Sequence, residues 1–318
     1  MRNTSPSSPL KWVGGKQRLL PDLIPIFPTA TRLVEPFVGA GSVFASLTYP
    51  YLLLADNNPN LINLYRELQA HPEALIARTC ELFTEQYKAA EAYAELRRRY
   101  NREGLEPQER AALLIYLNRF GFNGLYRVNR AGEYNVPYGH PQKLPAFPGE
   151  AMLRYSARLQ GAELVCADFE RVMERAVPGD VVYCDPPYAD LENRASFTGY
   201  GSGGFAWEDQ VRLVEKAIEL SSRGVPDLIS NHDTLATRRL YRDAEIHSFL
   251  VRRSVAASQS ARGEVHELVA VFTPAPLGAE GAFSEVVGSA AGCGRVHPDG
   301  PGGWQVHPIR EEIGVPCG

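Results

Sequence analysis

The sequence predicts an α/β fold in which a mainly parallel sheet is interrupted by an inserted, mostly helical domain. Two short apolar runs, one beginning at Leu33 and the other at Val181, have the length of buried strands, and each stops at residues typical of a loop. Between them, residues 72–117 carry apolar side chains at helical spacing with few helix breakers. We therefore expect one sheet, built from chain on both sides of a helical insertion.

The first apolar run leads into a glycine turn and a second strand. The turn is Gly39-Ala40-Gly41, preceded by Phe37; an amphipathic run that predicts a helix follows, and then the apolar residues 51–55 end at Asp56. Glycines let the backbone approach a ligand, and an acid at the second strand tip can accept hydrogen bonds from ribose hydroxyls. The third glycine of the dinucleotide fingerprint is missing and the acid comes early, which disfavours nicotinamide or flavin cofactors. S-adenosylmethionine, a nucleoside without pyrophosphate that carries an electrophilic methyl group, fits better.

The second apolar run ends at the tetrapeptide Asp185-Pro186-Pro187-Tyr188. Open α/β sheets bind their ligands at the carboxyl ends of such strands. A carboxylate and a proline carbonyl can accept the two protons of an exocyclic ring amine and direct its lone pair toward an electrophile, while a tyrosine offers the ring a flat face. We interpret these four residues as the catalytic segment. A plain strand-ending turn is the alternative, because Asp-Pro is ordinary turn chemistry.

A third motif lies near the N-terminus, where Gly14-Gly15 is flanked by Lys11, Trp12 and Lys16. Taken alone, it also fits a flexible lead-in with a tethering lysine. With the glycine turn and the Asp-Pro-Pro-Tyr segment in this order, however, the chain resembles the Dam-type DNA adenine methyltransferases, which methylate the 6-amino group of adenine with S-adenosylmethionine. The resemblance runs from about residue 10 to about residue 272 and includes the stretches 116–125 and 228–234. It implies a Rossmann-like methyltransferase sheet with an inserted DNA-recognition domain that bears a hairpin loop.

The resemblance also implies roles for individual residues. Asp185, Pro186 and Tyr188 would hold the target adenine, Lys11 would lie near the DNA, and Asp168-Phe169 would contact the adenine of the cofactor. The predicted cofactor-binding residues are Trp12, Lys16, Phe37, Gly39, Gly41, Asp56, Asp168, Phe169 and Asp185.

Residues 121–129 are similar to the GATC-reading hairpin of this family. In that hairpin an aromatic wedge and an asparagine fill the space left by the flipped base, while leucine and arginine read flanking pairs. Phe122 stands where a tyrosine is common, so it keeps the stacking face and lacks a hydroxyl. The predicted DNA-binding residues are Lys11, Arg119, Phe122, Asn123, Leu125, Arg127 and Asn129.

The charge distribution favours duplex DNA as a partner although the whole chain has a net charge of −4. The tail from Pro274 onward contributes −3, whereas residues 97–145 hold nine bases against four acids. Arginines in such a segment can contact phosphates or guanine edges, and interleaved aromatic rings can stack on or wedge between bases. These aromatic residues are Tyr100, Tyr116, Phe120, Phe122, Tyr126, Tyr134 and Tyr138. A solvated basic helix over an aromatic core is the alternative, which we favour only for residues 97–102.

Composition points to an intracellular enzyme without a metal. The five cysteines are odd in number and contain no Cys-x-x-Cys pair, and the seven histidines are scattered, so neither disulfides nor a metal site are expected. No apolar run has the length of a membrane span and no leader opens the chain. We expect a monomeric cytoplasmic protein, associated with the nucleoid through DNA.

The predicted organisation has three parts. Residues 1–60 and 150–273 form the catalytic, S-adenosylmethionine-binding domain; residues 61–149 form the inserted DNA-recognition domain; the tail 274–318, rich in glycine and proline, is expected to be disordered. Further strands are expected at 163–167, 227–230, 246–251 and 266–272, the last two as an edge hairpin, and a helix at 207–222. The glycine-rich loop 191–204 could close over a flipped base or serve as a spacer.

The function expected from these features is methylation of the 6-amino group of adenine in duplex DNA, most simply at GATC, after rotation of the base out of the helix. Two alternatives stay open. RNA or protein-glutamine amide methyltransferases share the cofactor fold, usually with asparagine in place of Asp185. A non-catalytic DNA-binding regulator could also keep the fold.

Overall fold

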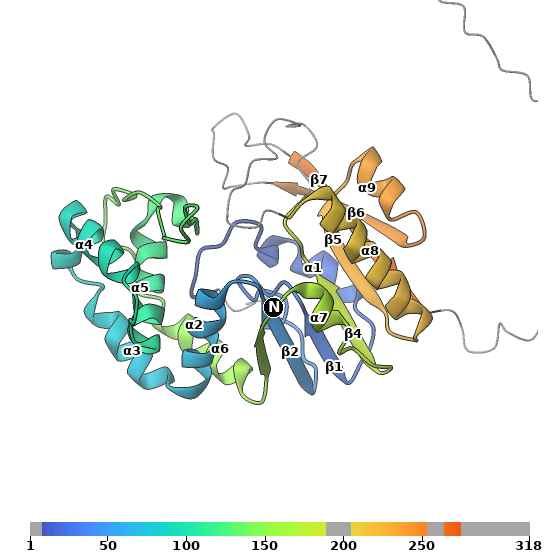
Figure 1. Ribbon diagram of the computed structural model, residues 1–318, viewed down its shortest axis with the longest axis horizontal. Coiled ribbons are helices and arrows are strands. Elements are labelled where there is room, and N and C mark those ends of the chain that lie inside the picture. The colour runs from blue at the N-terminus through green and yellow to red at the C-terminus, as the bar shows by residue number, and fades with distance from the viewer. Residues whose placement is uncertain (1–7, 189–204, 253–263, 275–318) are drawn as a thin grey trace, which may run out of the picture. The chain divides into compact units, whose positions relative to one another are not determined.

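One seven-stranded sheet organises the residues that the computed structural model describes, which are 8–188, 205–252 and 264–274 (Figure 1). The strands are β1 (Arg32–Glu35), β2 (Tyr51–Asp56), β3 (Glu163–Cys166), β4 (Asp180–Cys184), β5 (Asp227–His232), β6 (Glu245–Arg252) and β7 (Glu264–Phe272). Their spatial order is β3-β2-β1-β4-β5-β7-β6; β1 to β5 are parallel, and β7 is antiparallel to both its neighbours. The predicted α/β fold is confirmed.

Both faces of the sheet are buried under helices. Alternate side chains of a strand point to opposite faces, so in β2 Leu52 and Leu54 join one core while Leu53 and Ala55 join the other. This explains why the parallel strands are continuous apolar runs in the sequence. The helices are α1 (Leu20–Leu23), α2 (Pro59–Ala70), α3 (Pro72–Glu81), α4 (Ala90–Tyr100), α5 (Pro107–Phe120), α6 (Gly149–Leu159), α7 (Phe169–Met173), α8 (Trp207–Ser222) and α9 (Leu235–Leu240).

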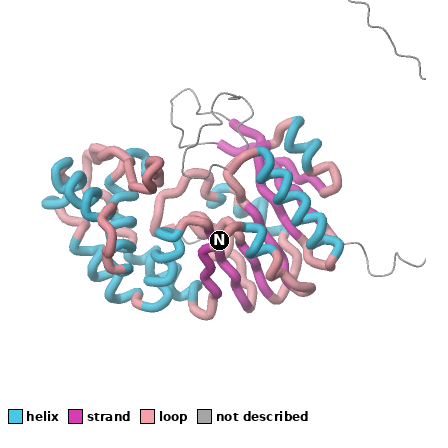
Figure 2. Tube along the Cα trace, viewed as in Figure 1, coloured by secondary structure: helices cyan, strands magenta, loops and turns pink. Residues whose placement is uncertain are grey.

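The insertion between β2 and β3 is almost entirely helix and loop (Figure 2). Its centre is α5, which packs against α2, α3 and α4 and buries every residue from Ala111 to Asn118. A helix that is apolar on all sides is stable only when it is enclosed in this way. The predicted helical insertion is therefore confirmed, whereas the domain boundaries at 61 and 149 stay a prediction.

The stretch after Gly41 corrects one expected element. A helix was predicted there, but the residues between the glycine turn and β2 form successive turns. Two α-helical hydrogen bonds close, from the Ala45 amide to the Gly41 carbonyl and from the Leu47 amide to the Val43 carbonyl, together with one 3₁₀ bond from the Ser46 amide to the Val43 carbonyl. The segment is too short for a stable helix before Pro50 and the start of β2, since a helix needs several turns to offset its nucleation cost.

The predictions for the second half of the chain are confirmed in outline. Helix α8 has the expected bounds, and β6 and β7 form the expected hairpin, with β6 at the edge and β7 inside the sheet. Helix α9 was not predicted. The loop 191–204 and the tail from residue 275 lie outside the described residues.

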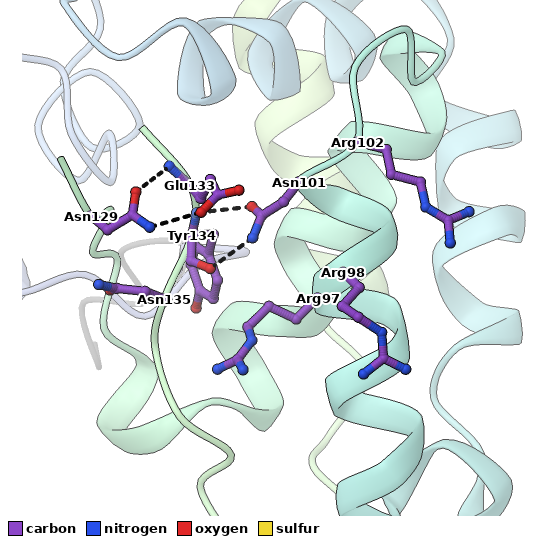
Figure 3. Close-up of a pocket in the computed structure, with 8 residues that line it drawn as sticks. All are labelled: Arg97, Arg98, Asn101, Arg102, Asn129, Glu133, Tyr134 and Asn135. Atoms are coloured by element: carbon purple, nitrogen blue, oxygen red, sulfur yellow. Dashed lines mark hydrogen bonds between the residues drawn. The ribbon is translucent and has the colours of Figure 1, made fainter. Parts of the chain in front are cut away.

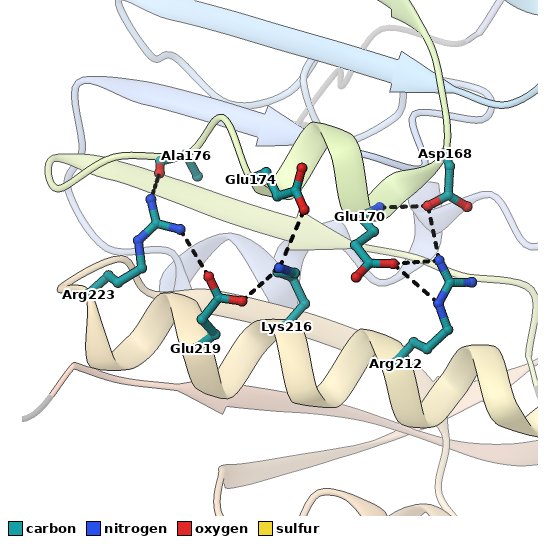
Figure 4. Close-up of polar contacts among 8 residues, drawn as sticks. All are labelled: Asp168, Glu170, Glu174, Ala176, Arg212, Lys216, Glu219 and Arg223. Carbon is teal, nitrogen blue, oxygen red and sulfur yellow. Dashed lines mark hydrogen bonds and ion pairs between the residues drawn. The ribbon is translucent and has the colours of Figure 1, made fainter.

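Charged side chains join α7 to α8 on the surface (Figure 4). The Arg212 guanidinium lies 3.2 Å from a carboxylate oxygen of Asp168 and 2.6 Å from one of Glu170, and the Lys216 ammonium lies 3.8 Å from a carboxylate oxygen of Glu174. Exposed pairs of this kind contribute at most about 1 kcal/mol each. Their main consequence is positional, because they fix the helix that starts at the predicted cofactor residue Asp168.

Candidate active site

The sequence motifs meet at the carboxyl ends of adjacent parallel strands. Strand β1 lies between β2 and β4 in parallel register, so Glu35, Asp56 and Asp185 stand at or just beyond the same edge of the sheet. The chain order reverses between β1 and β4, which is the switch point where open α/β sheets bind ligands. The sheet topology thus confirms that Asp185 follows a buried parallel strand.

Lys16 connects the N-terminal motif to the catalytic segment. Its ammonium lies 2.7 Å from an Asp185 carboxylate oxygen, donates a hydrogen bond of 3.0 Å to the Gly14 carbonyl, and lies 4.7 Å from the centre of the Tyr188 ring. The side chain is only 4% exposed, so the motif is not a loose lead-in. Burial raises the pKa of the Asp185 carboxyl, and the Lys16 charge opposes that rise. The pair places a carboxyl acceptor and a cation side by side at the strand tip.

A buried amide pair supports the backbone of the catalytic segment. The Gln210 side chain on α8 donates a hydrogen bond of 2.9 Å to the Pro187 carbonyl. Asn231 on β5 donates in turn to the Gln210 side-chain oxygen at 3.0 Å and to the Tyr241 hydroxyl at 2.8 Å. Gln210 and Asn231 are both almost fully buried. Because buried amides are costly without partners, this arrangement holds one geometry firmly.

The Tyr188 ring is fixed from two further strands. Its hydroxyl donates a hydrogen bond of 3.0 Å to the buried Glu267 carboxylate on β7, and its ring meets the His232 ring in a T-shaped arrangement with centres 4.6 Å apart. The Pro186 carbonyl accepts no hydrogen bond from the described residues. The segment therefore presents an acceptor carbonyl beside a carboxylate and an oriented aromatic ring.

The glycine turn is built around Asp56. Its carboxylate accepts hydrogen bonds from the Gly39 amide at 3.1 Å and the Asn58 amide at 2.9 Å. Burial raises the pKa of this carboxyl, and the backbone amides oppose the rise. Gly39 and Gly41 have φ of +46° and +73°, and a Cβ at Gly41 would clash with the Phe44 ring, so the turn requires glycine.

Three phenylalanines form an aromatic cluster beside the turn. Phe37 stacks on Phe169 with ring centres 5.4 Å apart, and Phe205 meets both rings at 5.6 and 5.7 Å. Asp168 caps α7 by accepting a hydrogen bond of 3.0 Å from the Glu170 amide, and it also pairs with the Arg212 side chain. The predicted residues Phe37, Asp168 and Phe169 are thus brought together.

Glu35 is a buried acid in the same region. It is 2% exposed, and its Oε1 atom has no hydrogen-bond partner among the described residues. Burial, and secondarily the charge of Asp185, raise its pKa well above the usual range. An unpaired buried carboxyl oxygen is costly, so it marks a place where a donor or cationic group of a ligand would be favoured.

The predicted hairpin forms through two isolated bridges, Gly121 with Tyr138 and Val128 with Tyr134. Its polar side chains bond to one another: the Asn129 amide donates to the Glu133 carboxylate at 2.8 Å, and the Arg127 guanidinium donates to the Asn135 side-chain oxygen at 2.8 Å. Figure 3 shows the polar hollow between this hairpin and α4. It is lined by Arg97, Arg98, Asn101, Arg102, Asn129, Glu133, Tyr134 and Asn135.

Residues at the end of α5 attach the N-terminal segment to the hairpin. The Asn118 side chain accepts from the Lys11 amide at 2.7 Å and donates to the carbonyls of Lys11 and Gly124, both at 2.8 Å. The Arg119 guanidinium, predicted to contact DNA, donates to the Pro9 carbonyl at 2.7 and 2.9 Å. Contact of Arg119 with DNA would require exchange of these bonds, and that role stays a prediction. Phe122, by contrast, is 44% exposed.

The aromatic residues of the basic segment require a correction. Tyr116, Phe120 and Tyr134 are 0–1% exposed, so the prediction that they stack on bases is wrong, whereas the burial of Tyr100 agrees with the aromatic core expected for residues 97–102. Tyr100 on α4 and Tyr116 and Phe120 on α5 point into the core of the helical insertion. Tyr116 and Phe120 are four residues apart, so they lie on the same face of α5. The aromatic core expected under residues 97–102 therefore continues into α5, which has no basic residue between Ala111 and Asn118.

Sequence patterns missed Gln210, Asn231, Glu267 and Phe205. One signal was present: Gln210 lies on the α8 face that carries Leu213, Val214 and Ala217, where an apolar residue is expected. Within the part of the chain that the structure describes, no group of three or more His, Cys, Asp or Glu side chains is placed to hold a metal ion. No helix in that part is long and apolar enough to cross a membrane.

A parallel sheet that gathers a glycine turn, an acidic strand tip and an Asp-Pro-Pro-Tyr segment at one edge is the arrangement of an α/β methyltransferase that acts on an amine. A family model described as D12 class N6 adenine-specific DNA methyltransferase matches residues 12–255. The chain belongs to this family and is an adenine-specific DNA methyltransferase.

Curated relatives agree with this assignment. The chain is 42% identical over 266 residues to a DNA adenine methylase of Vibrio cholerae, and 43% identical over 265 residues to one of Escherichia coli K12. Each alignment covers 83% of this chain and 95% of the relative. A DNA adenine methylase of Serratia marcescens is 40% identical over 264 residues, covering 83% and 97%. The resemblance inferred from the motifs is confirmed.

Proposed function

We propose that this methyltransferase uses S-adenosylmethionine, acts on adenine in the duplex sequence GATC, and rotates the base out of the helix before transfer. The observation that carries the proposal is the Asp185-Pro186-Pro187-Tyr188 segment at the tip of β4, held by Lys16 at 2.7 Å beside the glycine turn and Asp56.

The residues at the strand tips fit this cofactor. Asp56 is placed to accept hydrogen bonds from ribose hydroxyls, and the phenylalanine cluster offers apolar faces to an adenine ring. The unpartnered Oε1 of Glu35 suits the amino group of a methionine moiety. Trp12 packs against the turn so closely that a Cβ added at Gly39 would lie 3.3 Å from the indole nitrogen. S-adenosylmethionine, when bound, supplies a methyl group already activated by its sulfonium.

The catalytic segment would then hold the acceptor. Asp185 and the Pro186 carbonyl accept the two N–H bonds of the adenine 6-amino group, which localises the nitrogen lone pair toward the methyl group. Tyr188 stacks on the flipped base, and Glu267 keeps the ring in that orientation. Rotation of the base costs a few kcal/mol, which stacking and these hydrogen bonds offset. Lys16, 2.7 Å from Asp185, opposes the rise in the pKa of that carboxyl and so favours its charged, accepting form.

We assign recognition of the target sequence to the hairpin. Phe122 is exposed beside Asn123, as a wedge into the space of the flipped base requires, while Leu125, Arg127 and Asn129 follow on the same strand of the hairpin. Lys11 packs against Gly124, so a cation lies next to this strand. Arginine can pair with guanine through two hydrogen bonds, which gives the strongest base discrimination.

Transfer of a labelled methyl group tests the proposal. The purified full chain, given labelled S-adenosylmethionine, should label duplex DNA containing GATC and yield 6-methyladenine after hydrolysis to nucleosides. A plasmid treated in this way should resist a nuclease that cuts only unmethylated GATC and become a substrate for one that requires the methyl group. Labelling of RNA or protein instead of DNA would support the amide or RNA methyltransferase alternative. Binding of DNA without any transfer would support the regulator.

A further inference from the structure

Tyr126 lies in the hairpin but points into the protein. Its ring stacks on Trp12, with centres 5.5 Å apart and planes inclined by 27°. Its hydroxyl accepts a hydrogen bond of 3.1 Å from the side-chain amide of Asn60 and donates one of 3.2 Å to the Asn58 side-chain oxygen. These three partners come from the N-terminal motif and from the start of α2, so Tyr126 is turned toward those elements.

Both sets of partners lead directly to the predicted cofactor residues. Asn58 donates its backbone amide to Asp56 at 2.9 Å, and Asp56 accepts the Gly39 amide through its other oxygen. Trp12 packs on the same Gly39. Two short routes, one through a stacked ring and one through hydrogen bonds, therefore join Tyr126 to the glycine turn.

On the other side, Tyr126 is part of the base-reading strand. It is flanked in the chain by Leu125 and Arg127, the two residues predicted to read flanking base pairs. The Leu125 carbonyl accepts a hydrogen bond of 3.0 Å from the Tyr134 hydroxyl, and the rings of Tyr126 and Tyr134 are 5.8 Å apart. The backbone that presents the reading residues is thus fixed at Tyr126.

We propose that Tyr126 is the positioning residue that couples the cofactor site to the recognition hairpin, an inference that rests on the function proposed above. A ligand that orders Asp56 and Trp12 fixes the Tyr126 ring and hydroxyl, and with them the strand that carries Leu125 and Arg127. Because binding free energies are linked, cofactor and cognate DNA then raise each other's affinity by the same factor. The coupling is specific to the cognate sequence, since the same strand reads the bases.

The test is a binding cycle on the full chain. The affinity for a GATC duplex and for a duplex with one substituted pair is measured with and without S-adenosylhomocysteine, a non-reactive probe of the cofactor site. In the parent, we expect the probe to tighten GATC binding by about 5-fold or more, within the usual range of couplings between sites. Tyr126→Phe keeps the stacked ring and loses both hydroxyl bonds, so this factor should fall at least about threefold while affinity for the probe alone changes little.

A matched control separates coupling from general loss of a buried hydroxyl. Tyr116→Phe removes a hydroxyl that donates to the Tyr87 carbonyl at 2.6 Å and touches neither Trp12 nor Asn58. It should leave the coupling factor at the parental value. Asn60→Ala removes one of the two bonds from the α2 side and should lower coupling in the same direction as Tyr126→Phe, which keeps the test decisive if the first variant folds poorly.

The outcomes are distinct. An unchanged coupling factor in Tyr126→Phe and Asn60→Ala, or a parent whose GATC affinity ignores the probe, overturns the role of Tyr126 while leaving methyl transfer intact. An equal loss in Tyr116→Phe also overturns it. A parent that transfers no methyl group to any duplex contradicts the proposed function itself.

Discussion

The sheet edge and the hairpin hold their polar side chains in different ways. At the edge, Lys16 and Gln210 are at most 4% exposed, and each bonds to a partner on a different element. In the hairpin, Arg127 and Asn129 bond to Asn135 and Glu133 a few residues away in the same loop. The first arrangement is fixed by the whole fold; the second is local and partly open to solvent.

This difference indicates different roles for the sheet edge and the hairpin. Side chains at the sheet edge are already oriented, so the site offers its acceptors without reorganisation when a base enters. Under the proposed function, hairpin side chains would exchange bonds within the loop for bonds to DNA, so only a sequence that replaces those bonds well would be favoured. We therefore expect substitutions at the edge to reduce the rate on every substrate, and substitutions in the hairpin to change which substrate is preferred.

The largest effect is expected at Asp185. Asp185→Ala removes the acceptor at the reacting amine, so methyl transfer should fall below about a tenth of the parent while DNA affinity stays near the parental value. Initial rates with labelled cofactor and anisotropy with a fluorescent duplex measure the two quantities. Asp180→Asn is the control, because Asp180 is a buried, cation-paired acid at the opposite end of β4. Substantial turnover by Asp185→Ala would remove Asp185 from the chemistry.

A smaller loss of rate is expected when the side chain that supports the backbone of the catalytic segment is changed. Gln210→Glu keeps the size of the side chain but loses the amide donor to the Pro187 carbonyl, so kcat should fall about 10–100-fold with KM for DNA little changed. Gln69→Glu is matched to it, since Gln69 donates its amide to the Leu159 and Ala162 carbonyls away from the site. A rise in KM with unchanged kcat would assign Gln210 to binding.

A substitution at Asp227 should change the stability of the fold rather than the activity. This carboxyl is fully buried on β5 and accepts no hydrogen bond from a nitrogen or oxygen donor of the described residues. Burial raises its pKa well above the usual range, and the neighbouring Cys184 thiol opposes that rise. A raised pKa means that the folded state is favoured below the unfolded pKa near about 4, and that this advantage is lost as pH rises toward the folded pKa.

Asp227→Asn cannot ionise, so it should match the parent near pH 4 and exceed it at higher pH, by about 1.4 kcal/mol for each pH unit between the two pKa values. Urea unfolding from pH 4 to pH 8 measures this difference. Asp180→Asn should instead lower the free energy of unfolding at neutral pH, because it removes the carboxylate that pairs with the Arg32 guanidinium. A difference between Asp227→Asn and the parent that does not vary with pH would contradict the account.

The smallest effect is expected from the tail. A chain that ends at Pro274 should keep the parental methylation rate and unfolding midpoint, because the sequence beyond it lacks the apolar pattern needed to pack on the rest. Removal of its net charge of −3 should tighten DNA binding at low salt. Loss of soluble protein or of activity would show instead that the tail belongs to the folded enzyme.

The strand tips could be predicted because local signals agree there. An apolar run that stops at an acid specifies both a strand and the position of the acid, so Asp56 and Asp185 were placed by sequence, and the sheet brought them to one edge. Contacts over long chain separations could not be predicted in this way. Nothing local in the sequence shows that Gln210 supports Pro187 or that Glu267 orients Tyr188.

The aromatic residues of the insertion show a different limit. Composition cannot distinguish a ring that stacks on a base from one that packs inside a helical domain, and most of these rings prove to be core. Tyr126 illustrates the point: it stands between two predicted base readers, yet it faces Trp12 and Asn58. Charge does not separate the two cases either, because the Arg119 guanidinium donates to the Pro9 carbonyl.

The most direct test of the division between the two regions is the rate of methylation by Arg127→Ala on GATC and on sites with one substituted pair, at two salt concentrations. If Arg127 reads a guanine edge, the variant should lose about 1–3 kcal/mol of discrimination at one pair, so near-cognate sites gain relative to GATC. A phosphate contact would instead weaken all sequences alike and lower the salt slope by about one. Uniform weakening with unchanged preference would contradict the assignment of the hairpin as the element that selects the sequence.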